Sequence, residues 1–245
     1  DVRQGEILAV AGVQGNGQTE LAEVILGLRT PDSGVIRLEG ADITRARPRE
    51  SLDAGVGFIP EDRSTDGIIA SFSIADNLVL DQFRSSSFSA AGSLKRGAIA
   101  RNAREKETEY DIRLTSIEDP VSSLSGGNQQ KVVVAREMSR DLTLLVANQP
   151  TRGVDVGSIE FIHRRIVDVR DQGCAVLLIS SELDEVVSLA DRIAVMYRGR
   201  IVGIVPADTG RDVLGLMMAG VPLDEAVADS SGSAQESGAP RKEEQ

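Results

Sequence analysis

The chain has 245 residues, 41% of them hydrophobic, so it can bury the core of one large domain or of a domain with a subdomain. Its formal net charge of −11 and its 3% aromatic content argue against sequence-independent nucleic-acid binding and against a base-stacking surface. A single cysteine excludes an internal disulfide, and no apolar run reaches the roughly 18 residues that a membrane span needs.

The first predicted elements are a strand and a helix joined by a glycine-rich loop. Residues 5–10 (GEILAV) suit a buried strand, and apolar residues then recur at helical spacing as far as Leu28. Between them lies GVQGNGQT, residues 12–19, called the phosphate loop below. The chain begins at Asp1 in strand-like composition without a visible signal peptide, so we expect it to be a piece of a longer polypeptide.

The phosphate loop follows a known pattern with one departure. In G-x-x-x-x-G-K-[ST], Gly12 and Gly17 are the two glycines and Thr19 is the last residue. Gln18 stands where lysine is expected. Because a strand precedes the loop and a helix follows it, the context favours phosphate binding.

A dinucleotide-binding motif is the alternative for the same loop. It would use Gly15 and Gly17 as G-x-G, with Glu39 at about the distance of a ribose ligand. Its third glycine is replaced by Glu20, so we prefer the phosphate loop. A nicotinamide-dependent oxidoreductase remains the corresponding functional alternative.

The next stretch predicts short elements followed by a helical region. A turn at residues 31–34 precedes strands at 35–38 and 56–59, with a helix around 49–54 between them. The second strand ends at Pro60-Glu61-Asp62-Arg63, a charged run that is usually a solvated loop. Helices are then expected at 74–83 and 97–114, joined by a Ser/Ala/Gly-rich link at 85–94.

Residues 124–131, LSGGNQQK, open the next predicted helix and are called the signature segment below. Ser125 is placed to cap this helix. Gly126 and Gly127 leave its first amides bare, so a phosphate can approach the positive end of the helix dipole. An ordinary Ser-Gly-Gly turn before a core helix has the same sequence, so the neighbouring motifs must decide between the two.

The last third alternates buried strands with helices. A strand at 142–147 ends at Asn148-Gln149-Pro150-Thr151, and one at 175–179 follows Cys174, which we interpret as core filler. The helix around 159–169 carries His163 beside its apolar stripe, and we interpret this histidine as packing or surface rather than as a ligand.

The carboxyl-terminal elements are a hairpin and a short helix. The second of the buried strands ends at Ser180-Ser181-Glu182 and leads into a helix at 182–189. Strands at 193–197 and 201–205 should pair as a hairpin, followed by a helix at 211–219. Residues 226–245 are rich in Ser, Gly, Glu, Lys and Pro, which predicts a disordered tail.

The order of these motifs resembles the ATP-binding cassette of ABC transporters over residues 5–220. The resemblance implies an α/β fold of the P-loop NTPase type, with a mostly parallel core sheet, flanking helices and a partial antiparallel β portion. We expect the core over residues 1–70 and 141–220, and a helical subdomain over 71–140 that ends in the signature helix.

In that family two cassettes stack head to tail, and each ATP is held between the phosphate loop of one and the signature segment of the other. The resemblance therefore implies nucleotide contacts from Gly12, Gly15, Asn16, Gly17, Gln18 and Thr19. It implies contacts to the partner's nucleotide from Ser125, Gly126, Gly127, Asn128 and Gln129. Asp155 falls in the loop that crosses the dimer interface.

Five positions depart from the family's pattern. They are Gln18 for the lysine, Glu61 for the glutamine that senses metal and water, Asn148 for the acidic residue that orders Mg²⁺, Gln149 for the glutamate that polarises water, and Ser181 for the switch histidine. Thr19 and Asn148 are then the remaining, weak metal ligands, and no catalytic residue is intact.

Three of these departures, at Gln18, Asn148 and Gln149, replace a charged side chain at one site by a neutral amide. Losing the lysine removes a charge-assisted contact worth about 1.5–3 kcal/mol, and losing the glutamate removes a base that contributes typically about 10²–10⁴ in rate. A neutral amide is also a weaker ligand for Mg²⁺ than a carboxylate. We therefore predict that this cassette's own site is hydrolytically silent, while its signature segment serves a partner.

Several strings, among them PEDR, GNGQTEL, NQPTRGVDVG and SSELDEV, resemble the second cassette of importers for nucleosides and simple sugars. Sugar-type second cassettes commonly keep an arginine at position 18 and acidic residues at 148 and 149, so Gln18 and Gln149 favour the nucleoside branch. A ribose-, galactose- or xylose-type importer is the alternative. A soluble ABC ATPase acting on ribosomes or DNA is a further one, which the acidic charge disfavours.

The resemblance also implies cofactors, partners and location. ATP and Mg²⁺ are the expected cofactors of a transport ATPase. The expected partners are an N-terminal cassette of the same chain or a second copy, integral membrane permease subunits and, indirectly, an extracellular solute-binding protein, with no nucleic acid. Docking through the helical insert and the loop at 61–72 would place the chain on the cytoplasmic face of the cell membrane.

Overall fold

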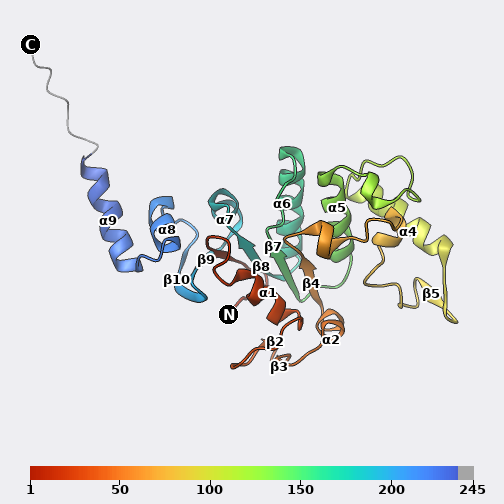
Figure 1. Ribbon diagram of the computed structural model, residues 1–245, viewed down its shortest axis with the longest axis horizontal. Helices are drawn as coiled ribbons and strands as arrows, with labels where there is room; N and C mark the ends of the chain where they lie inside the picture. The colour runs from red at the N-terminus through yellow and green to blue at the C-terminus, as the bar shows by residue number, and fades with distance from the viewer. Residues whose placement is uncertain (237–245) are drawn as a thin grey trace, which may run out of the picture.

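A six-stranded sheet forms the centre of the computed structural model, which describes residues 1–236 (Figure 1). The strands lie in the order β10-β9-β1-β8-β7-β4, and all neighbours are parallel except β9 and β10. Their bounds are β1 Ile7–Ala11, β4 Val56–Ile59, β7 Leu144–Asn148, β8 Ala175–Ser180, β9 Arg192–Tyr197 and β10 Arg200–Pro206. Two small antiparallel pairs lie outside this sheet, β2 Arg37–Leu38 with β3 Ala41–Asp42, and β5 Ser89–Ala90 with β6 Ser93–Leu94.

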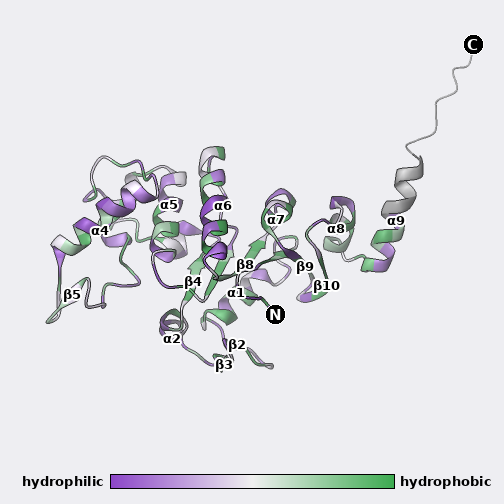
Figure 2. Ribbon diagram, turned by 180° about the vertical axis from the view of Figure 1, so that it is seen from behind, coloured by the Kyte–Doolittle hydropathy of each residue, from purple (hydrophilic) through white to green (hydrophobic). Residues whose placement is uncertain are grey.

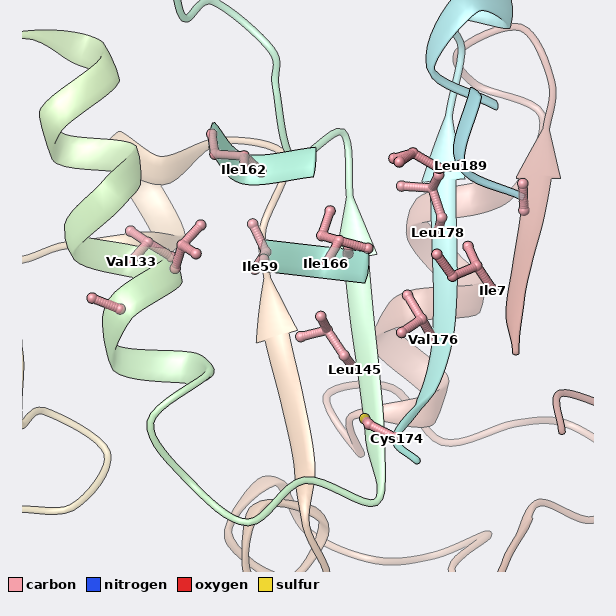
Figure 3. Close-up of a cluster of buried hydrophobic side chains, with 14 of the residues drawn as sticks. Ile7, Ile59, Val133, Leu145, Ile162, Ile166, Cys174, Val176, Leu178 and Leu189 are labelled. Carbon is pink, nitrogen blue, oxygen red and sulfur yellow. The ribbon is translucent and has the colours of Figure 1, made fainter. Parts of the chain in front are cut away.

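Both faces of the sheet are buried, which explains why its strands are continuous apolar runs rather than alternating ones. On one face Ile7, Leu145 and Leu178 pack with side chains from the covering helices, such as Ile162 and Ile166 (Figure 3). On the other face the alternate strand residues pack with the helix after β1; these are Leu8, Val10, Val146, Leu177 and Ile179. The expected strands of the core are therefore confirmed. So is the role of Cys174 as core filler, since the cysteine is 5% exposed and burial raises the pKa of its thiol to about 11.

Helices cover the sheet and extend it at both ends. Their bounds are α1 Gln18–Ile25, α2 Pro48–Asp53, α3 Ile74–Asn77, α4 Arg96–Glu109, α5 Gly126–Glu137, α6 Val156–Asp171, α7 Leu183–Leu189, α8 Arg211–Met218 and α9 Leu223–Glu236, with a π-turn at Arg63–Gly67 and a 3₁₀ turn at Val121–Ser123. In Figure 1, α4 and the β5–β6 pair lie at one end of the molecule and α8 and α9 at the other. Figure 2 shows hydrophobic strands at the centre and hydrophilic bands along α4 and α6. None of the helices in residues 1–236 is both long enough and apolar enough to cross a bilayer.

Two helices are shorter than expected, and the one expected over 97–114 ends at Glu109. The helix expected over 74–83 ends at Asn77, whose side-chain amide donates to the carbonyls of Ile69, Phe72 and Ser73 at 3.0–3.3 Å. The turn after the helix is of the 3₁₀ type: the Val79 N–H donates to the carbonyl of Asp76, three residues earlier, at 3.2 Å. The apolar pattern continues here because the turn is buried, not because the helix continues.

The expected tail also differs where the structure describes it. Residues 226–236 belong to α9, so the prediction of disorder is wrong for this part, while residues 237–245 lie outside the described residues. Ala226 is fully buried in the same apolar cluster as the residues of α8, and its N–H donates to the Pro222 carbonyl at 2.9 Å. One buried contact in the first turn, with Asp224 and Glu225 near the helix N-terminus, gives this polar sequence a helical start.

Candidate functional site

The phosphate loop follows β1 directly and turns into α1 through Gly17, whose φ of 105° lies in the left-handed region. Gln18 is only 6% exposed because its side chain folds back into the loop. Its Nε2 donates to the Val13 carbonyl at 3.0 Å, and its Oε1 accepts from the Asn16 N–H at 3.0 Å. The residue at the lysine position thus closes the loop on itself.

The turn between β9 and β10 holds the same loop from outside. The Asn16 carbonyl accepts from the Gly199 N–H at 2.8 Å, and the Asn16 side-chain oxygen accepts from the Arg198 N–H at 2.9 Å. A Cβ atom on Gly17 would stand 3.2 Å from the Cα atom of Gly199. The loop is therefore braced by a hairpin that is distant in sequence, a contact that the loop's own motif does not predict.

A cavity of about 440 Å³ opens beside this loop, at the carboxyl ends of β7 and β8. It brings together three of the expected site residues, Glu61, Gln149 and Ser181, with Gln14 of the phosphate loop. Gln149 is held at a φ of 50°, and its Nε2 donates to the Ser181 hydroxyl at 3.1 Å. The residues at the positions expected for the base and for the switch are thus neutral groups that bond to each other.

Glu61 supplies a carboxylate to this cavity, but two partners already contact it. Gln14 donates to its Oε1 at 2.7 Å, and the Arg152 guanidinium forms an ion pair with the same oxygen. This chain of contacts links the phosphate loop to the loop at residues 149–155 that precedes α6, called the interface loop below. The carboxylate therefore serves a contact between loops.

The expected metal ligands do not form a carboxylate site. Thr19 is exposed at the start of α1, and Asn148 is 3% exposed at the end of β7. Within residues 1–236 no group of three or more His, Cys, Asp or Glu side chains is placed to hold a metal ion. A hydroxyl and a neutral amide are a poor fit for Mg²⁺, which prefers charged oxygen ligands.

The signature segment forms the capped helix start that its sequence predicts. Ser125 is the N-cap of α5, and its hydroxyl accepts from the Asn128 N–H at 3.4 Å and from the Asn128 side-chain amide at 3.0 Å. The side-chain oxygen of Asn128 accepts from the Arg113 N–H at 2.9 Å, and Gln129 donates to the Leu124 carbonyl at 3.0 Å. Much of the hydrogen-bonding capacity of these two amide side chains is therefore used within the chain.

Both signature glycines are tightly packed against other segments. A Cβ on Gly126 would stand 2.6 Å from Nη2 of Arg63, whose guanidinium donates to the carbonyls of Arg152 at 3.0 Å and Gly153 at 3.4 Å. A Cβ on Gly127 would collide with the side chains of Asp155 and Ser158. The glycines thus have a packing reason within the chain in addition to any ligand.

Asp155 caps α6 next to the signature segment. It accepts from the Ser158 N–H at 3.0 Å and from the Ser158 hydroxyl at 2.9 Å. These hydrogen bonds, the hydroxyl first, lower the pKa of Asp155 below its usual range. The carboxylate is therefore ionised and fixed where the interface loop meets the signature segment.

The two halves of the expected site lie apart. The signature segment lines a second cavity of about 320 Å³ with Ser125, Asn128 and Asp155, and that cavity includes no residue of the phosphate loop. The phosphate-loop cavity includes no residue of the signature segment. The two halves therefore do not share one cavity.

Sequence reasoning missed the residues that connect the loops. Arg63, Arg152 and Gln14 were not expected to act, because their contacts join positions about 50–90 apart in sequence. The available signal was the PEDR string, whose Glu61 and Arg63 both contact the interface loop. His163 lies 3.0 Å from the Glu185 carboxylate, which also accepts from Thr151, and this fits the packing role expected for it.

A family model and the similar curated proteins point to the same family. The family model described as ABC transporter matches residues 1–152. The chain is 47% identical to the guanosine import ATP-binding protein NupO of Bacillus subtilis over 92% of this chain and 44% of that protein. It is 46% identical to the glucose import ATP-binding protein TsgD13 of Haloferax volcanii over 89% of this chain and 40% of that protein. The chain thus spans less than half the length of these relatives.

Solved structures agree on the fold. The dimeric structure of MJ0796, a bacterial ABC transporter cassette, superposes with a TM-score of 0.72 over 86% of this chain and 89% of that one. The sequence identity is 18%, so this likeness concerns the fold alone. The expected α/β architecture, with its mostly parallel sheet, is confirmed.

Proposed function

The chain belongs to the ABC transporter family, and from that premise we propose that it is the second cassette of an importer ATPase with two unlike cassettes. In this role it lends its signature segment to the nucleotide held by the partner cassette. Its own nucleotide site, at the phosphate loop, contributes little or no hydrolysis. ATP and Mg²⁺ are then bound chiefly through the partner's phosphate loop.

The observation that carries this proposal is the contrast between the two halves of the site. The signature helix begins with a capped, glycine-bearing turn whose first amides point out of the helix end. The phosphate-loop cavity, in contrast, has a neutral Gln149–Ser181 pair and a carboxylate, Glu61, engaged with Arg152. A phosphate would meet donors at the first half and little compensating charge at the second.

The test is the effect of Ser125→Ala on ATP hydrolysis by the full-length protein in its transporter complex. Donors that act on a phosphate in the transition state are typically worth about 10²–10³ in rate, so we expect a loss of that order. Ser122→Ala, an exposed serine just before the signature segment, is the matched control. Unchanged hydrolysis in Ser125→Ala would refute the donor role.

A second measurement addresses the silent site. A purified homodimer of this cassette should hydrolyse ATP at background rate, because Gln149 provides no base and position 18 no lysine. Turnover by this homodimer that a change at Gln149 abolishes would contradict the proposal.

An apolar groove supports docking on membrane subunits. A cavity of about 850 Å³ lies on the expected helical subdomain, residues 71–140, and its rim includes Phe72 at 46% exposure, Phe83 at 42% and Leu94 at 39%. Large apolar side chains gathered on one surface are typical of protein interfaces. We assign this groove to the permease, which places the cassette at the cytoplasmic face of the membrane, with the solute-binding protein contacting only the permease.

The transported solute is proposed as a nucleoside, with a simple sugar as the alternative. Gln18 and Gln149 favour the nucleoside branch, while relatives named for guanosine import and for glucose import match about equally well. Uptake of labelled guanosine and of labelled ribose by cells with and without the full-length gene separates the two. Co-purification with ribosomes instead of membranes would favour the soluble ABC ATPase.

A further inference from the structure

We propose that Gln18 determines what the phosphate loop accepts, because its carboxamide occupies the place of a phosphate oxygen inside the loop and so disfavours triphosphates. The inference rests on the proposed function only in taking this loop as the cassette's own nucleotide site. It names one residue and one physical cause for the low nucleotide affinity proposed for that site.

The geometry of the carboxamide carries the argument. Gln18 is 6% exposed, and its Nε2 stands 2.7 Å from the position of a Cβ on Gly12, so it lies across the floor of the loop. Its Oε1 accepts from the backbone N–H of Asn16 at 3.0 Å. Backbone N–H groups of a glycine-rich loop are the donors that cradle a phosphate, so an acceptor from within the chain already takes one of them.

Glutamine can do this and lysine cannot. A lysine side chain carries three donors and no acceptor, so it could bond to the Val13 carbonyl but could not take the Asn16 N–H. The carboxamide does both, with 3.0 Å to each partner. The substitution at position 18 therefore removes a positive charge and also adds a competitor for the loop's donors.

Neighbouring segments hold the loop backbone beside this carboxamide. The hairpin turn donates to Asn16 through Arg198 and Gly199 at 2.9 and 2.8 Å, which fixes the backbone at the residue whose N–H the carboxamide takes. At the loop's edge, Gln14 donates to the Glu61 carboxylate at 2.7 Å, and Glu61 is also paired with Arg152, so these side chains are already engaged with each other. An entering triphosphate must break two neutral hydrogen bonds, which lowers its affinity roughly tenfold to a hundredfold.

The experiment compares the chain with Gln18→Ala and Gln18→Asn, whose shorter side chains cannot span the loop, and with Gln172→Ala, an exposed glutamine at the end of α6, as control. Without ligand, we expect the Asn16 amide to exchange its hydrogen at least tenfold faster in both Gln18 variants than in the wild type and in Gln172→Ala. Inorganic tripolyphosphate, titrated calorimetrically, should bind the Gln18 variants at least tenfold more tightly.

Equal Asn16 exchange in all four proteins, or tripolyphosphate binding to the wild type as tight as to Gln18→Ala, would overturn the inference. If Gln18→Ala does not fold, as judged by its unfolding transition, Gln18→Asn carries the comparison. The readouts need no partner cassette, so their failure leaves the Ser125→Ala result standing, and a failed Ser125→Ala test leaves these readouts meaningful.

Discussion

The terminal nitrogen Nη2 of Arg63 lies 2.6 Å from the position that a Cβ atom on Gly126 would occupy. One guanidinium thereby connects the loop after β4, the interface loop and the start of the signature helix. A residue other than glycine at position 126 must displace the end of this side chain, so the glycine leaves room for a neighbour within the chain.

Gly126→Ala should therefore move the Arg63 guanidinium off the carbonyls of Arg152 and Gly153. We expect the free energy of unfolding to fall by about 1 kcal/mol, because two partly exposed hydrogen bonds are lost. In the Arg63→Ala background the same change should cost less, a coupling of about 1 kcal/mol in a double-mutant cycle measured by urea unfolding. If the effects of Gly126→Ala and Arg63→Ala on the free energy of unfolding are strictly additive, the contact between these two residues does not explain the destabilisation.

Restoring the charged side chains at positions 18, 148 and 149 should restore hydrolysis only when the three substitutions are combined. Gln149→Glu alone should leave the homodimer at background, because Gln18 and Asn148 are still neutral. The triple variant Gln18→Lys, Asn148→Asp, Gln149→Glu should raise ATP turnover at least roughly a hundredfold. Adding Ser125→Ala to it should remove the gain, and a single variant as active as the triple would contradict the account.

The apolar groove can be tested separately from the chemistry. Phe72 is 46% exposed, so Phe72→Ala should change the free energy of unfolding by less than about 0.5 kcal/mol. Co-purification with the permease subunits should fall several-fold. Ile204→Ala, at 48% exposure on β10, is the matched control and should leave co-purification unchanged. A loss with both variants, or with neither, would count against this groove as the docking surface.

A buried carboxyl should make stability depend on pH. Burial, assisted by the nearby Glu137, raises the pKa of Asp81 to about 6 in spite of Arg140, whose Nε lies 2.7 Å away. Because the folded state holds this proton more tightly than the unfolded chain, the associated stability is present below about pH 4 and is lost as pH rises through about 6.

The expected loss is up to about 3 kcal/mol between those pH values, measured as the wild-type free energy of unfolding relative to Asp81→Asn. Asp53→Asn, which removes an exposed carboxylate paired with Arg49, should keep the wild-type pH profile. The same pH profile in Asp81→Asn and the wild type would show that another group titrates.

The central strands were predictable because strands such as β7 and β8 are buried on both faces, and such strands have an unbroken apolar run in the sequence. The cap at Ser125 was predictable because capping is local. The end of α3 was not, because it depends on bonds from the Asn77 side chain to a preceding loop. Nor was the start of α9, where one buried alanine outweighs a polar composition.

In the candidate site, too, local features could be predicted from the sequence and long-range contacts could not. The sequence places Gln149 and Ser181 at the ends of two strands, but only the pairing of β7 with β8 brings their side chains together. The contacts of Arg63 with the interface loop, and of Asn16 with the hairpin turn, join segments about 90 and 180 residues apart. Local pattern carries no information about such pairs.

The position of β1 between β8 and β9 has a consequence for how the molecule is made. Although β1 occupies residues 7–11, both of its neighbours come after residue 174. During synthesis on a ribosome, this apolar strand stays unpaired until most of the chain has emerged, because its neighbouring strands are made late. A fragment that stops at residue 152 would lack both neighbouring strands, so we expect it to aggregate rather than fold into a smaller working unit.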